Sequence, residues 1–200
     1  MEWVLATGNA GKLREIVALL AGLDGTVRAQ SHYHVPPVEE TGTTFVENAI
    51  IKARHAARHS GLPALADDSG LVVDALGGAP GVYSARYAGS GASDTDNLDQ
   101  LLLAAATIPD DARSCRFVCV MVAMRDADDP LPLIATGRWQ GMLLRAPRGE
   151  GGFGYDPIFL VPGHGCSSAE LASAVKNQLS HRRQALRALR GMLEAQDSWR

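Results

Sequence analysis

The start of this 200-residue chain limits its fold most strongly, because a strand, a glycine-containing loop and a helix follow one another there. Trp3 to Ala6 is a short apolar run that predicts a first strand. Apolar residues then recur at helical spacing from Leu13 to Leu20. This order is typical of an α/β fold. The length is enough for one such domain or for two small lobes.

Strands and helices continue to mix along the chain. Because neighbouring strands occur without a helix between them, we expect a mixed rather than a wholly parallel sheet. The residue patterns predict further strands near 26–30, 64–67, 71–75, 115–124, 133–144 and 158–161. They predict helices from Thr44 to His59, from Ser93 or Asp94 to Ala106 and from Ser180 to Glu194, with a brief helical piece opening at Ser167 or Ser168.

Charge, apolar runs and cysteines exclude several classes of protein. The net charge of −3 argues against a general nucleic-acid binder. There is no run of about twenty apolar residues to span a membrane, and Met1-Glu2-Trp3 does not begin a signal peptide. Three cysteines without CxxC spacing argue against a zinc site or a disulfide framework. We therefore expect reduced thiols and a cytoplasmic protein with neither nucleic-acid nor membrane partners.

Two adjacent carboxylates, Asp67-Asp68, stand before Ser69-Gly70, where one apolar run ends and another begins. Ionised acids beside a core are costly unless a cation meets them, and a hard divalent cation is one such partner. The alternative is an acidic turn, because Asp, Ser and Gly favour turns for backbone reasons. In either case we expect the strand to break into a tight turn here.

The loop Thr7-Gly8-Asn9-Ala10-Gly11-Lys12 leads from the first strand into a helix. Small residues let backbone N–H groups approach an anion, and a helix N-terminus favours negative charge. Lys12 could then contact phosphate oxygens. The glycine spacing and Leu13 after the lysine exclude a Walker loop. An ordinary strand-to-helix turn is the alternative.

Three further groups of residues have the character of a site. Glu39-Glu40 precede a helix on which Asn48 and Lys52 are candidate site residues, whereas His55 and His59 fit a solvated face. In Gly151-Gly152-Phe153-Gly154-Tyr155-Asp156-Pro157, glycines free a ring to stack on a nucleobase, although both aromatics could equally lie in the core. Near the start of the last helix, where acids are preferred, stand the cationic residues Lys176, His181 and Arg182, which suggests a site. The alternative is that they are ordinary basic residues of the protein surface.

These motifs occur in one order along nearly the whole chain, together with Gly78-Ala79-Pro80-Gly81-Val82-Tyr83-Ser84-Ala85-Arg86-Tyr87. The sequence closely resembles the inosine triphosphate pyrophosphatase family, the non-canonical purine NTP pyrophosphatases. The resemblance implies one nucleoside-triphosphate pyrophosphatase domain over residues 1–200. It also implies a long mixed sheet with flanking helices that form two lobes around a central substrate cleft.

The resemblance further implies an enzyme that hydrolyses XTP, ITP or dITP to the monophosphate and pyrophosphate. It implies Mg²⁺ as cofactor, a homodimer, and a metal-bound water as nucleophile. Asp68 would be the catalytic base, and Glu40 and Asp68 would bind the metal. The substrate would be bound by Thr7, Gly8, Asn9, Ala10, Gly11, Lys12, Lys52, Ser69, Phe153, Gly154, Tyr155, Asp156, Lys176, His181 and Arg182.

Two rival functions are weaker. A pyrophosphatase of the septum-inhibition type, acting on modified pyrimidines, would have a Ser-rich start with an Arg pair, unlike Thr7-Gly8-Asn9 and Lys12. An inactive nucleotide-sensing module would be expected to lose Glu40, Lys52 or Asp68, and all three are present. Ala174-Val175 and His164-Gly165-Cys166 depart from the family pattern without touching this set.

Overall fold

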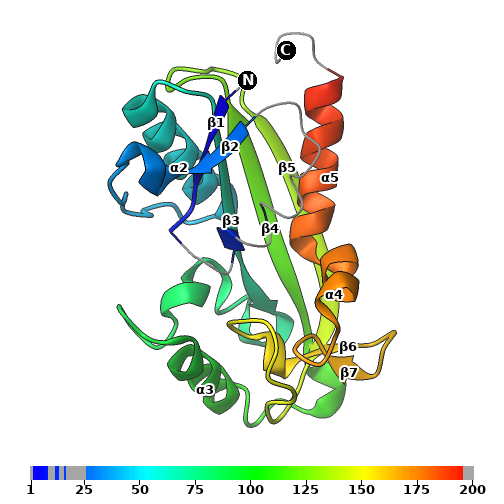
Figure 1. The fold of residues 1–200 in the computed structure, drawn as a ribbon. Helices are drawn as coiled ribbons and strands as arrows, with labels where there is room; N and C mark the ends of the chain where they lie inside the picture. Colours follow the sequence, from blue (N-terminus) through cyan, green and yellow to red (C-terminus); the bar gives the residue numbers. More distant parts are fainter. Residues whose placement is uncertain (1, 9–11, 14–15, 17–25, 196–200) are drawn as a thin grey trace. The chain divides into compact units, whose positions relative to one another are not determined.

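The computed structural model describes residues 2–8, 12, 13, 16 and 26–195 (Figure 1). The chain divides into two compact units. The first unit comprises Met1–Asp68, Cys119–Gly137 and His181–Arg200, and the second comprises Ser69–Val118 and Arg138–Ser180. Each unit is described by itself below.

Within the described residues, seven strands form one mixed sheet in the order β2-β1-β3-β4-β5-β6-β7 (Figure 1). β1 pairs in parallel with β2 and β3, whereas β6 is antiparallel to β5 and β7. The predicted mixed α/β fold is therefore confirmed. The strands are β1 (Glu2–Ala6), β2 (Thr26–Ala29), β3 (Ala64–Val73), β4 (Ser114–Met124), β5 (Leu133–Leu143), β6 (Phe159–Val161) and β7 (Cys166–Ser167).

The predicted break at the acid pair is wrong, because β3 runs without interruption from Ala64 to Val73. Gly70 does not form a turn but lets another segment of the chain lie close to the strand. A Cβ there would collide with the Ser84 hydroxyl and the Gly81 carbonyl, and the same hydroxyl accepts the Leu71 N–H at 3.0 Å. Because Asp67 and Asp68 lie in an extended strand, their side chains leave its backbone in opposite directions.

Local signals set the ends of the longest helix, α2 (Phe45–Ser60). The Thr44 hydroxyl accepts the Glu47 N–H at 3.2 Å, and the Glu47 carboxylate accepts the Thr44 N–H at 2.9 Å, forming a capping box. Gly61 ends the helix with a φ of 67°. The predicted helix is confirmed.

From residue 26 to residue 195, the other helices are α3 (Asp94–Ala104), α4 (Ser173–Leu179) and α5 (His181–Glu194). The same part of the chain has 3₁₀ turns at Gln30–Tyr33, Asp74–Leu76, Gly81–Arg86, Asp110–Ala112 and Asp156–Ile158. The predicted helical piece at Ser167 or Ser168 is wrong. Ser167 lies in β7 and pairs with Leu160 of β6. Its hydroxyl donates to the Arg148 carbonyl at 2.6 Å. Of the helix predicted over 13–20, Leu13 and Ile16 are helical and the other positions lie outside the described residues.

Each unit has its own apolar core. In the first unit, Ala49, Ala53, Ala56 and Ala57 of α2 pack with residues of β1, β3 and β4, and a second cluster joins Trp3, Leu65 and Met121 to Leu186 and Leu189 of α5. In the second unit, Phe117, Trp139 and Phe159 form an aromatic cluster. The centroid of the Phe159 ring lies 4.6 Å from that of Phe117 and 5.0 Å from that of Trp139.

The two strand cysteines lie inside these cores. Cys115 and Cys119 are buried and free, and burial raises the pKa of each thiol to about 12. Both thiols are therefore protonated and behave as small buried hydrophobes. Among the residues that the structure describes, no helix is both long enough and apolar enough to cross a membrane.

Asp129 gives the β4–β5 turn a pH-dependent contribution to stability. Its buried carboxylate accepts Arg125 Nη2 at 2.6 Å and the backbone N–H groups of Arg125 and Leu131 at 3.0 Å each. The Arg125 hydrogen bond, with these backbone bonds, lowers the pKa of Asp129 to about 2. An unfolded Asp titrates near ~3.9, so this stability is present above about pH 4 and is lost toward pH 2.

We expect Asp129→Asn to remove this pH dependence. Urea unfolding at pH 6, 4, 3 and 2 should show the wild-type advantage in unfolding free energy over the variant shrinking by about 1–2 kcal/mol as the pH falls. The exposed neighbour Asp128 provides the control, because Asp128→Asn should follow the wild-type curve. An advantage that stays constant from pH 6 to pH 2 would contradict the assignment.

Candidate active site

Three side chains far apart in the sequence meet in the first unit. Lys52 Nζ on α2 lies 2.9 Å from Asp68 Oδ1 on β3 and 3.3 Å from Glu40 Oε1 in the loop before α2. The ammonium is largely buried, which lowers its pKa, but the carboxylates Asp67, Asp68 and Glu40 outweigh burial and raise it. Lys52 is therefore a fixed positive charge held between two carboxylates.

Asn48 ties this group to the loop. Its Oδ1 accepts the Gly42 N–H at 2.8 Å, and its Nδ2 lies 3.5 Å from Asp68 Oδ2. Burial raises the pKa of Asp68, although Lys52 opposes that effect. A carboxylate with a raised pKa is a better proton acceptor than an ordinary aspartate. The helical spacing of Asn48 and Lys52 was the signal that joined them in the sequence.

Asp67 pairs with a different lysine. Its Oδ2 lies 3.2 Å from Lys12 Nζ, and its side chain is fully buried. Burial alone would raise the pKa of Asp67, but nearby cations, Lys12 foremost, hold it below its ordinary range. Asp67 is thus an ionised carboxylate that holds Lys12 in place, and its role differs from that of Asp68.

The donor set around Lys52 fits a hard divalent cation. Two carboxylates already converge on one positive charge, and Mg²⁺ in nucleotide enzymes commonly takes one or two carboxylates with waters and phosphate oxygens. No group of three or more His, Cys, Asp or Glu side chains able to hold a metal occurs among residues 2–8, 12, 13, 16 and 26–195. Glu40 and Asp68 are therefore the carboxylates that could hold a divalent cation here.

The other predicted residues of the first unit lie at the ends of elements. Thr7 and Gly8 follow β1, while Asn9, Ala10 and Gly11 lie outside the described residues. His181 and Arg182 are buried in the first turn of α5. Arg182 is one of the cations that lower the pKa of Asp67, so the start of α5 interacts electrostatically with Asp67.

In the second unit, Asp156 organises the glycine-rich loop. Its Oδ2 accepts the Phe153 N–H at 2.9 Å and Lys176 Nζ at 2.7 Å, and its Oδ1 accepts the Ser168 hydroxyl at 2.7 Å. The residue is only 3% exposed. Gly152, at a φ of 77°, lies so close to this carboxylate that a Cβ would collide with it. Ser168 belongs to this network although no sequence pattern pointed to it.

The two aromatics of the loop have different environments. Tyr155 is buried and its hydroxyl donates to the Ser84 carbonyl at 2.7 Å, and burial raises its pKa. Phe153 is half-buried, with Lys176 Nζ 5.1 Å from its ring centroid. Tyr155 is therefore a core residue, whereas the Phe153 ring is only partly buried. Ser69 is half-buried on β3, at the start of the second unit.

Comparison with known proteins identifies the family. The model of the Ham1 family matches residues 3–192. The chain belongs to the Ham1 family. It is 61% identical over 193 residues to a dITP/XTP pyrophosphatase of Vibrio cholerae, covering 96% of both chains. It is 59% identical over 186 residues to a dITP/XTP pyrophosphatase of Pectobacterium atrosepticum, covering 93% of this chain and 94% of that protein.

Solved Ham1 structures have the same fold. A HAM1 protein from Coxiella burnetii superposes with a TM-score of 0.91 at 52% identity, covering 98% of this chain and all of that one. The Ham1 protein of Staphylococcus aureus gives a TM-score of 0.86 at 40% identity. The family resemblance predicted from the ordered motifs is confirmed.

Proposed function

We propose that this chain is a pyrophosphatase that hydrolyses non-canonical purine nucleoside triphosphates, XTP, ITP and dITP, to the monophosphate and pyrophosphate. The observation that carries the proposal is the convergence of Glu40 and Asp68 on Lys52 in a Ham1-family chain. The relatives named dITP/XTP pyrophosphatase support the same substrates.

The first unit would act on the triphosphate. Lys12 and Lys52 supply positive charge, and the motif that begins at Thr7 and Gly8 would bind phosphate oxygens. A magnesium ion held by Glu40 and Asp68 would offset charge that develops on the α-phosphate. Asp68 orients the attacking water and accepts its proton, aided by its raised pKa. Asn48 holds Asp68 for this step.

The base would be recognised chiefly by the residues of the glycine-rich loop. Phe153 stacks on the purine, with Gly154, Tyr155 and Asp156 shaping the loop and Ser69 contacting the substrate beside Asp68. Lys176, His181 and Arg182 would contact the base and sugar, and Arg182 would supply a donor for a 6-oxo group. Adenine presents an amino donor at that position and would leave such donors unpaired, which is a strong basis for rejection.

The setting proposed for the enzyme follows from the family resemblance and from the thiols. We infer a single catalytic domain over residues 1–200 that acts as a homodimer in the cytoplasm, with neither nucleic acid nor membrane as partner. The buried, reduced Cys115 and Cys119 agree with a reducing compartment.

A substrate panel tests the proposal. Pyrophosphate release would be measured from dITP, XTP, ITP, ATP, GTP and dTTP with Mg²⁺ and again with EDTA. Rapid release from the first three, slow release from ATP and dTTP, and loss of release in EDTA are expected. Equal rates on ATP and dITP would refute the specificity, and full activity in EDTA would refute the metal requirement.

Phe153→Ala should raise the KM for dITP, because each base stacked on an aromatic ring contributes roughly 1–3 kcal/mol. The expected increase is about 5-fold or more, with a smaller effect on kcat. Tyr83 is an aromatic of the same unit with 56% of its surface exposed, so Tyr83→Ala serves as the control and should leave KM within about twofold of wild type. An unchanged KM for Phe153→Ala would place the ring among structural residues only.

A further inference from the structure

Asp94, the first residue of α3, contacts the glycine-rich loop from a distant part of the sequence. Its Oδ2 accepts the Gly154 N–H at 2.8 Å. Gly154 directly follows Phe153 and has a φ of 61°, a conformation that glycine adopts readily. Asp94 therefore fixes the peptide group that joins the Phe153 ring to the rest of the loop.

Three consecutive loop residues are thus held by three separate anchors. Asp156 accepts the Phe153 N–H, Asp94 accepts the Gly154 N–H, and the Tyr155 hydroxyl donates to Ser84. Four glycines in six residues would otherwise leave this segment with many accessible backbone conformations. Asp156 and Tyr155 are buried, whereas Asp94 is exposed, so its replacement removes one anchor without opening the core.

The start of α3, which carries Asp94, is itself held in place by hydrogen bonds. Ser93 and Asp96 form a capping box at its start. Asn97 accepts the Ala88 N–H at 2.8 Å and donates to the Ala85 carbonyl at 3.3 Å. The first turns of the helix, which carry Asp94, are therefore fixed to the preceding segment of the same unit.

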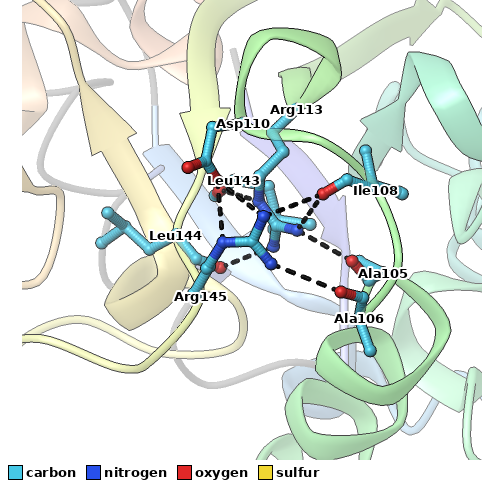
Figure 2. Close-up of polar contacts among 8 residues, drawn as sticks. All are labelled: Ala105, Ala106, Ile108, Asp110, Arg113, Leu143, Leu144 and Arg145. Atoms are coloured by element: carbon cyan, nitrogen blue, oxygen red, sulfur yellow. Dashed lines mark hydrogen bonds and ion pairs between the residues drawn. The ribbon is translucent and has the colours of Figure 1, made fainter.

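The other end of α3 is held by two arginines (Figure 2). The buried Arg113 guanidinium donates to the Ala105 carbonyl at 2.8 Å, next to the last residue of α3, and to the Leu143 carbonyl at the end of β5 at 2.7 Å. Arg145 donates to Asp110 at 2.7 Å and to the Ile108 carbonyl at 3.1 Å (Figure 2). Both ends of α3 are thus held by neighbouring segments of the second unit, to which the helix belongs.

We propose that Asp94 is a positioning residue for base recognition, which sets the Phe153 ring for stacking through its bond to the Gly154 N–H. This inference rests on the proposed stacking role of Phe153. Hydrogen bonds to a carboxylate are stronger than those between neutral groups. Without this one, the loop samples orientations in which the ring cannot receive the purine, so the apparent affinity for substrate falls.

The first test measures the steady-state kinetics of Asp94 variants. Asp94→Ala should raise the KM for dITP by about 5- to 20-fold with kcat changed by less than about twofold, as expected for loss of one charge-assisted hydrogen bond. Asp94→Asn retains an oxygen acceptor and should recover most of the loss. Asp99, exposed on the same helix, provides the control Asp99→Ala, which should match wild type.

Amide hydrogen exchange of the substrate-free enzyme tests the contact without catalysis. In Asp94→Ala the Gly154 amide should exchange about 10-fold faster or more, while the Phe153 amide, held by Asp156, keeps its rate. Equal acceleration throughout α3 and the loop would indicate general destabilisation and overturn the positioning role. An unchanged Gly154 rate would overturn the contact itself.

A double-mutant cycle separates this inference from the proposed function. If Asp94 acts through the ring, Asp94→Ala adds little to KM in a Phe153→Ala background. Additive effects would overturn the inference. If Phe153→Ala alone leaves KM unchanged, the proposed stacking fails, whereas a raised KM for Phe153→Ala with an unchanged KM for Asp94→Ala refutes only the role of Asp94.

Discussion

Asp68→Asn is expected to lower the kcat for dITP hydrolysis by about 10²- to 10⁴-fold, the range typical of losing a general base. The amide keeps the size of the side chain but cannot accept the proton of the attacking water. Lys12, Lys52 and Phe153 remain, so nucleotide binding measured by calorimetry should change far less than turnover.

Asp111, an exposed acid of the second unit, gives the matched control. Asp111→Asn should retain the wild-type kcat. A kcat within about threefold of wild type for Asp68→Asn would remove Asp68 from the proton-transfer step. Equal losses in binding and kcat would instead indicate that Asp68 acts mainly by holding the metal and substrate.

Lys52→Met is expected to lower kcat/KM by about 10²- to 10³-fold, comparable to removing one preorganised electrostatic contact to a developing charge. The variant loses a cation for the phosphates and leaves Glu40 and Asp68 facing each other without their shared partner. Arg58, exposed on the same helix, provides the control Arg58→Met, which should retain activity.

The pH profile of Lys52→Met gives a second readout. Because Lys52 lowers the pKa of Asp68, its removal raises that pKa further. The base form is then lost at a higher pH, and the acidic limb of kcat/KM should move upward. An acidic limb that stays in place would mean that Lys52 does not act on Asp68 in the working enzyme.

Local signals predicted the elements that depend on local chemistry. The apolar run of β1, the Thr44–Glu47 capping box and the helical spacing of α2 all lie within a few residues of what they specify. β3 was predicted as two strands because Asp, Ser and Gly, the residue types from Asp67 to Gly70, are typical of turns. Glycine is needed at position 70 because Gly81 and Ser84 lie too close to leave room for a side chain. Both are more than ten residues away in the sequence, so no local pattern could indicate this contact.

The candidate site shows the same limit. The sequence pointed to Glu40, Lys52 and Asp68, and the structure brings them together. It did not distinguish the half-buried Phe153 from the buried Tyr155, because the two aromatics stand on either side of Gly154 in one glycine-rich loop. Asp94 and Ser168 were noted only as possible helix starts, because their partners in the site lie 60 and 12 positions away in the sequence.

Hydrolysis in ¹⁸O-labelled water tests the central claim most directly. Wild-type enzyme with dITP and Mg²⁺ should yield dIMP and pyrophosphate in equal amounts, with the label in dIMP, because the water attacks the α-phosphorus. Formation of dIDP and orthophosphate, or label in pyrophosphate instead of dIMP, would contradict the account.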